Sequence, residues 1–213
     1  MINNLEILLP ELFLFTSILI VLMVGVFQNN SYNLVNKLSL LILLVTILIL
    51  LNDNNEVFKV FSNSFIKDGY SNFIKILILI SSMFVLNLSQ TFIKENNINK
   101  FEYPIIILLS ILGMFFMVSS NDLILFYLGL ELQSLALYIL AAIDRDNTRS
   151  TEAGLKYFIL SALSSGLLLY GCSLLYGFTG STNFDIISLK LTSENTGAVF
   201  AMVFVLVGLA FKI

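Results

Sequence analysis

Long apolar runs, separated by short polar stretches, constrain this chain more than any other feature of its sequence. Several runs reach the roughly 18–20 residues needed to cross a bilayer, whereas core segments of soluble proteins are shorter and amphipathic. Because lipid offers no hydrogen-bond partners, the backbone groups of each run must bond within it, which predicts helices. The composition agrees, with 58% hydrophobic and 12% charged residues. The expected fold is therefore all-α membrane, a polytopic transmembrane helix bundle.

The runs divide the chain into about seven expected spans within a single transmembrane domain that covers residues 1–213. The expected spans are residues 7–27, 34–51, 71–93, 103–118, 122–143, 153–178 and 197–213, and the last one is incomplete. No Gly/Ser-rich linker or change in composition marks a second domain. An excess of Lys and Arg on the side of the 144–151 loop favours the matrix or cytoplasm there, with the N-terminus on the opposite side.

The residue types exclude several kinds of chemistry. The chain has no His and a single Cys, Cys172, which removes His ligation of haem, most zinc chemistry, disulfides within the chain and iron–sulfur binding. A net charge of −3 without a basic cluster argues against a nucleic-acid partner. The first ten residues lack Lys and Arg, unlike a transit peptide. We expect no cofactor or metal in this chain. We also expect the gene to be encoded in an organelle or a bacterium, and the Asn-rich loops favour a mitochondrial gene.

Two charged residues lie deep within the expected spans. Glu131 is about 13 Å along its span at the helical rise of 1.5 Å per residue, and Lys212 is well inside the last span. A charge at the bilayer centre costs about 2.5–3.5 kcal/mol on insertion scales, so such residues face protein or water and usually mark an ion path. The alternative is a buried ion pair that only fixes the register of the helices.

A Glu–Lys pair on different helices suits proton transfer for a physical reason. A desolvated Lys loses its proton more readily, and a nearby carboxylate restores its affinity for that proton, so a change of separation loads or releases a proton. Lys156, near the start of the sixth span, is a candidate entry-side relay, although snorkelling to the surface explains it equally well. Ser134 shares a helix face with Glu131 and could hold water, whereas Lys75 and Asp122 are expected at span boundaries.

Small residues in the sixth span indicate close helix packing rather than a direct functional role. They include Gly154, Ser161, Ser164, Ser165 and Gly171, and Cys172 is interpreted in the same way. Gly208 lies four residues before Lys212 and is expected to leave room beside the Lys side chain.

Two segments carry a resemblance to a known family. Residues 130–142 read LELQSLALYILAA, and residues 150–162 read STEAGLKYFILSA. Together with GLAFKI at 208–213, they resemble the antiporter-like subunits of respiratory complex I, in particular NADH dehydrogenase (ubiquinone) subunit 2.

The resemblance implies a fourteen-helix fold with two inverted five-helix repeats, of which this chain is the first half. It implies a proton channel around Glu131 and Lys212, with Lys156 as a further lysine, in a proton-translocating NADH:ubiquinone reductase of the mitochondrial inner membrane. NADH, FMN, iron–sulfur clusters and ubiquinone are expected on partner subunits. Other membrane-arm subunits and membrane lipids are the expected partners.

The end of the sequence departs from the family pattern, because members of this family continue beyond the position of Ile213. We expect a split subunit whose second half is a separate chain, with an incomplete gene model as the alternative. Two other functions also stay open. One is a structural membrane subunit with a register-fixing ion pair, and the other is a stand-alone cation/proton antiporter subunit with the same fold.

Overall fold

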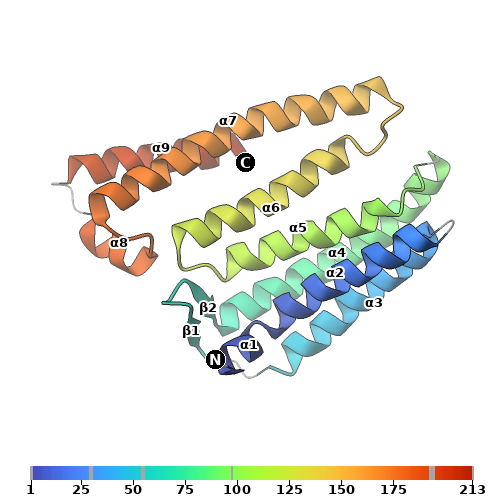
Figure 1. Ribbon diagram of the computed structural model, residues 1–213, viewed down its shortest axis with the longest axis horizontal. Helices are drawn as coiled ribbons and strands as arrows, with labels where there is room; N and C mark the ends of the chain where they lie inside the picture. Colours follow the sequence, from blue (N-terminus) through green and yellow to red (C-terminus); the bar gives the residue numbers. More distant parts are fainter. Residues whose placement is uncertain (1, 29–30, 54–55, 97, 192–194, 213) are drawn as a thin grey trace.

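The computed structural model describes residues 2–28, 31–53, 56–96, 98–191 and 195–212. In chain order the described elements are α1 (Ile2–Ile7), α2 (Leu9–Phe27), α3 (Tyr32–Leu51), β1 (Phe58–Val60), β2 (Phe65–Lys67), α4 (Gly69–Glu95), α5 (Glu102–Val118), α6 (Leu123–Ala141), α7 (Thr148–Thr179), α8 (Phe184–Lys190) and α9 (Thr196–Lys212). The long helices run side by side along one axis, with α2 to α5 on one side, α6 in the middle, and α7 with α9 on the other (Figure 1). The expectation of a helical membrane bundle is confirmed.

Seven helices occupy the stretches in which spans were expected. Five of them, α2, α3, α4, α6 and α7, are long and apolar enough to cross a membrane, and α5 and α9 are apolar helices of 17 residues each. The largest difference is at α7, which begins at Thr148 because the side chain of Asn147 caps its first turn by accepting a hydrogen bond from the Arg149 amide. Ile213, the last residue of the expected seventh span, lies outside the described residues.

The small elements were not expected from the sequence. Strands β1 and β2 form an antiparallel hairpin, and the turn residues Phe61, Ser62 and Asn63 all have positive φ angles. Helix α4 follows directly and starts with a capping box, in which Asp68 accepts from the Ser71 amide while the Ser71 hydroxyl accepts from the Asp68 amide. The hairpin therefore lies against the end of the bundle where α4 begins (Figure 1).

Two apolar clusters hold the helices together. The first joins α2, α3, α4 and α5, with Leu14, Leu43, Leu79 and Leu108 all fully buried. The second joins α6, α7, α8 and α9 around Leu168, Cys172 and Val205, among others. Large apolar side chains cover much of the remaining surface, such as Ile20, Phe84, Leu128 and Leu163, which suits a surface that faces lipid.

Small residues allow close approach where the two parts meet. A Cβ atom on Gly129 of α6 would lie 2.8 Å from the Gly113 carbonyl oxygen of α5, and one on Gly171 of α7 would lie 2.7 Å from the Val205 amide of α9. Glycine is required at these positions because any side chain would force the backbones apart. The first crossing holds α6 against α5, and the second holds α9 against α7.

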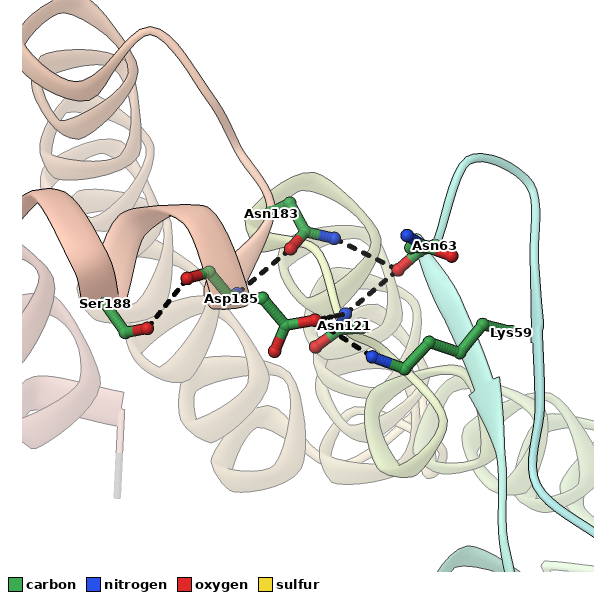
Figure 2. A network of polar contacts seen from close by, with 6 residues as sticks. All are labelled: Lys59, Asn63, Asn121, Asn183, Asp185 and Ser188. Atoms are coloured by element: carbon green, nitrogen blue, oxygen red, sulfur yellow. Dashed lines mark hydrogen bonds and ion pairs between the residues drawn. The ribbon is translucent and has the colours of Figure 1, made fainter.

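A polar network links the hairpin to the C-terminal part of the chain (Figure 2). The Lys59 ammonium of β1 forms a 3.0 Å ion pair with Asp185 of α8. The side-chain amides of Asn121 and Asn183 both donate to the Asn63 carbonyl oxygen, each over 3.1 Å. The network thus fastens the positive-φ turn to the α5–α6 connection and to the start of α8.

Candidate functional site: a buried Glu–Ser–Lys cluster

Glu131 and Lys212, the two deep charges, meet inside the bundle. The Lys212 Nζ atom lies 2.5 Å from the Glu131 Oε1 atom, which joins α9 to α6. The Lys212 side chain is 7% exposed and that of Glu131 is 22% exposed. An ammonium and a carboxylate in this geometry form a charge-assisted hydrogen bond, and burial strengthens their attraction because little water screens it.

Ser165 of α7 completes the cluster, so that three helices contribute one polar side chain each. Its hydroxyl donates to Glu131 Oε1 and accepts from Lys212 Nζ over 2.8 Å. The sequence interpretation assigned Ser165 to helix packing alone, and the structure corrects this. The neighbouring Ser164 does serve packing, since its hydroxyl donates to the Gly208 carbonyl oxygen over 2.8 Å.

The local sequence explains why these side chains converge. Gly208 lies one turn before Lys212, and a Cβ atom there would lie 2.8 Å from the Leu168 amide of α7. Gly208 therefore brings α9 against α7, and Leu168 occupies the space beside Gly208 that the sequence interpretation left free for Lys212. This close approach places Lys212 next to Ser165, which lies one turn before Leu168 on α7.

A cavity of about 300 Å³ adjoins the cluster. Lys212 lines it together with Gln133, Ser134, Tyr157 and several apolar residues. The Ser134 hydroxyl donates to the Glu131 carbonyl oxygen over 3.1 Å, so this hydroxyl is not bonded to the carboxylate. A cavity of this size with several polar groups holds water readily, which would give Lys212 a partner for proton exchange.

Lys156, the third candidate, is not brought into the cluster. It forms a 2.6 Å ion pair with Glu152 on the same helix, and the Lys156 side chain is 69% exposed. Within the described residues, no hydrogen bond or ion pair connects it to Glu131, Ser165 or Lys212. It lies nine residues before Ser165 on α7, about 14 Å at the helical rise.

A second acid–base pair was missed by the sequence interpretation. Lys75 of α4, which was expected at a span boundary, is 2% exposed and lies 2.5 Å from Glu11 Oε1 of α2. The missed signal was the apolar surroundings of Lys75 in the sequence FIKILIL, residues 73–79. Asp122, the other expected boundary residue, caps the start of α6 and accepts a 2.5 Å hydrogen bond from Thr182.

The described residues contain no group of three or more His, Cys, Asp or Glu side chains that could hold a metal ion. Cys172 is buried in the second apolar cluster. The Glu131–Ser165–Lys212 cluster itself presents a carboxylate and an amine, two groups that can bind and release protons.

Comparison with known proteins shows similarity to antiporter-like subunits over part of their length. The family model described as "NADH:quinone oxidoreductase/Mrp antiporter, TM" matches residues 120–213, the part that contains the cluster. NADH-quinone oxidoreductase subunit N of Pelagibacter ubique is 53% identical over 212 residues, which are 99% of this chain and 45% of that protein. Its counterpart from Parvibaculum lavamentivorans is 49% identical over 96% of this chain and 43% of that protein.

The fold of the chain is similar to that of a solved respiratory complex I chain. A chain in the structure of respiratory complex I from Thermus thermophilus with bound aureothin matches with a TM-score of 0.78 and 29% sequence identity, over 95% of this chain and 43% of that chain. The chain spans under half the length of the curated relatives that it matches. Its helices thus match under half of the longer chain in that solved structure.

Proposed function

We propose that this chain is part of an antiporter-like membrane-arm subunit of a proton-pumping NADH:quinone oxidoreductase and helps to translocate protons through the Glu131–Ser165–Lys212 cluster. The observation that carries the proposal is the convergence of a carboxylate, a hydroxyl and an ammonium from three membrane helices beside a cavity. A pair of opposite charges in apolar surroundings is costly to maintain, which favours a role in ion movement.

Each residue has a defined role in this proposal. Lys212 gives up its proton when Glu131 moves away or is neutralised, because the amine then loses the carboxylate that stabilises its charge. Ser165 bonds to both charged groups and stabilises the charged form of each. Lys156 is proposed as an entry-side relay at one end of α7, which requires water between it and the cluster, given their separation along the helix.

The wider assembly is part of the same proposal. NADH, FMN, iron–sulfur clusters and quinone would lie on partner subunits, and other membrane-arm subunits would contact this one. The relatives named above are bacterial, which supports a bacterial membrane and does not support the mitochondrial inner membrane expected from the sequence. A separate chain for the second half also remains a prediction, and the intact mass of the subunit in the purified complex tests it.

The function is tested in the complete complex with Lys212→Met, a neutral change of similar size. We expect proton pumping coupled to NADH oxidation to fall. Removing one partner of a buried pair can also destabilise a protein by about 3–5 kcal/mol, so assembly must be measured too. Lys94→Met, the same substitution at an exposed position in the last turn of α4, is the control.

The double variant Glu131→Gln/Lys212→Met separates proton transfer from a structural role. If the pair only fixes helix register, removal of both charges restores assembly and leaves coupled turnover close to normal, because no unpaired charge stays buried. If the pair carries protons, the double variant assembles but does not pump. Normal pumping by the double variant would refute the proposal.

The structural-subunit function is the alternative that this comparison addresses. The stand-alone antiporter function is also open, because the matching family model covers both NADH:quinone oxidoreductases and Mrp antiporters. Co-purification distinguishes them: an antiporter subunit would separate from NADH-oxidising activity, whereas a complex I subunit would remain with it.

A further inference from the structure

The Glu11–Lys75 pair lies apart from the proposed proton path, in the part of the bundle formed by α2 to α5. Glu11 is in the first turn of α2 and Lys75 is in the second turn of α4, at the end of the bundle that carries the hairpin. Both side chains are 2% exposed, so this pair is more deeply buried than Glu131 and Lys212. Neither residue lines the cavity beside Lys212.

The Lys75 ammonium forms cation–π contacts with two aromatic rings. Its Nζ atom lies 5.3 Å from the ring centroid of Phe65 and 5.6 Å from that of Phe115. A desolvated ammonium is stabilised by the negative face of an aromatic ring. This stabilisation persists when Glu11 is neutral, so Lys75 can keep its proton in either state of Glu11. The carboxylate is therefore the partner whose proton occupancy can change.

Several polar atoms at this pair have no partner. Lys75 bonds to Glu11 Oε1, whereas Glu11 Oε2 is buried without a hydrogen bond. The Asn72 side chain is 4% exposed, and neither its Nδ2 nor its Oδ1 atom has a partner. Asn72 lies one turn before Lys75, on the same face of α4. Buried polar groups in this condition are usually satisfied by an internal water molecule.

A hollow at the hairpin end includes Pro10, the residue before Glu11. It has a volume of about 350 Å³ and is also lined by Glu6, Asp53 and Lys67, among others. Phe65 and Lys67 lie on the same face of β2, because side chains alternate along a strand, and Lys67 forms an ion pair with Asp53. Neither Glu11 nor Lys75 lines the hollow, so other side chains lie between the hollow and the pair.

Apolar side chains lie next to the pair on the inner side of the bundle. Leu14 lies about one turn beyond Glu11 on α2, and Leu79 lies one turn beyond Lys75 on α4. Both are fully buried in the first apolar cluster. Buried polar side chains lie farther along the same helices, such as Ser17 on α2 and Ser82 on α4.

We propose that Glu11, Lys75 and Asn72 form a proton-binding site that exchanges protons with the water at the hairpin end. A hydronium ion arriving through the hollow transfers one proton to Glu11 Oε2 and remains as water, held between Glu11 and Asn72. Lys75 keeps its proton, so the net charge of the pair rises from zero to +1. This site does not depend on the function proposed for the Glu131–Ser165–Lys212 cluster.

Other charged groups around the site set the local field. The charged groups are Glu6 of α1, Asp53 after α3, Lys67 of β2 and Asp68 at the N-cap of α4. Helix α5 contributes no charge here, only the Phe115 ring and the buried Ser119 hydroxyl at its C-cap. The acidic side chains favour the arrival of a hydronium ion at this end of the bundle.

Infrared difference spectroscopy of the complete complex tests the site. Spectra at mildly acidic and neutral pH are compared in the carbonyl-stretch region of protonated carboxylic acids, in H₂O and in D₂O. We expect a band that appears on acidification, shifts in D₂O, disappears in Glu11→Gln and persists in Glu131→Gln. A band that is lost in Glu131→Gln instead, or the absence of any Glu11-dependent band, would overturn the proposal.

Asn72→Leu supplies a second test that keeps the charges of Glu11 and Lys75. It can be carried out even if the Glu11→Gln variant fails to assemble into the complex. Without the amide and its water, the ionised form of Glu11 loses hydrogen-bond donors, so its affinity for protons should rise roughly tenfold. The midpoint of the Glu11 band then moves to higher pH. An unchanged midpoint in the assembled Asn72→Leu complex would show that Asn72 and a bound water take no part.

Discussion

Removal of the Ser165 hydroxyl is the most specific perturbation of the Glu131–Ser165–Lys212 cluster, because it leaves both charges in place. Ser165 donates to the Glu131 carboxylate and accepts from the Lys212 ammonium. Both bonds stabilise charged forms, so Ser165→Ala should favour a neutral Glu131 and a neutral Lys212. The carboxyl group would then hold its proton to higher pH, and the amine would release its proton at lower pH.

The magnitude follows from the strength of hydrogen bonds to charged groups, which is about 1.5–3 kcal/mol. Water in the adjoining cavity can replace part of the lost bonding, so the lower end of this range applies. Since about 1.4 kcal/mol corresponds to a tenfold change in proton affinity, each limb of the pH profile of coupled turnover should move inward by about one pH unit. The profile narrows from both sides.

The assay is NADH-driven proton pumping by the complete complex across a range of pH, with wild type, Ser165→Ala and Ser164→Ala in parallel. Ser164 is the matched control, because its hydroxyl bonds the Gly208 carbonyl oxygen and touches neither charge. We expect Ser164→Ala to lower thermal stability and to leave the pH profile in place. An unchanged profile in Ser165→Ala, or equal narrowing in both variants, would refute the role assigned to Ser165.

Two further predictions concern the packing and the hairpin. Gly208→Ala should destabilise the folded complex by about 1–3 kcal/mol and lower its melting temperature, because the new Cβ would lie 2.8 Å from the Leu168 amide. Gly177→Ala is the control, since a Cβ at that position has no atom within 4 Å, and it should be neutral or stabilising. Hydrogen bonds from Lys59, and to a smaller extent from Asn121, lower the pKa of Asp185 in the folded protein. The ionised Asp185 side chain therefore anchors the hairpin fully above the pKa of an unfolded Asp, about 3.9. This anchoring is lost as the pH falls through the lower pKa of Asp185 in the folded protein. The protection of the hairpin amides, measured relative to their intrinsic exchange rate at each pH, should therefore stay constant around neutral pH and fall in acid, and Asp185→Asn should show the lowered protection already at neutral pH.

The sequence determined the helices of this protein because span length, apolar composition and capping are properties of contiguous residues. The stretches expected to span the membrane coincide with helices to within a few residues, and the motif at 130–142 lies within the segment that the family model matches. Glu131 and Lys212 were also identifiable, since depth along a helix follows from counting residues. The β-hairpin was missed because its turn depends on contacts with Asn121 and Asn183, which are distant in the sequence.

Only the tertiary structure decided which charges meet. Glu11 and Lys75 are 64 residues apart and lie near the ends of their helices, where snorkelling to water would have been the ordinary outcome. Packing of α2, α4 and α5 around them encloses the pair instead. Ser165 looked like one of several small packing residues, and its role depends on the approach of α9 to α7 at Gly208. A sequence specifies how deep a side chain lies along its own helix, whereas its neighbours across the bundle determine whether it faces lipid, water or an opposite charge.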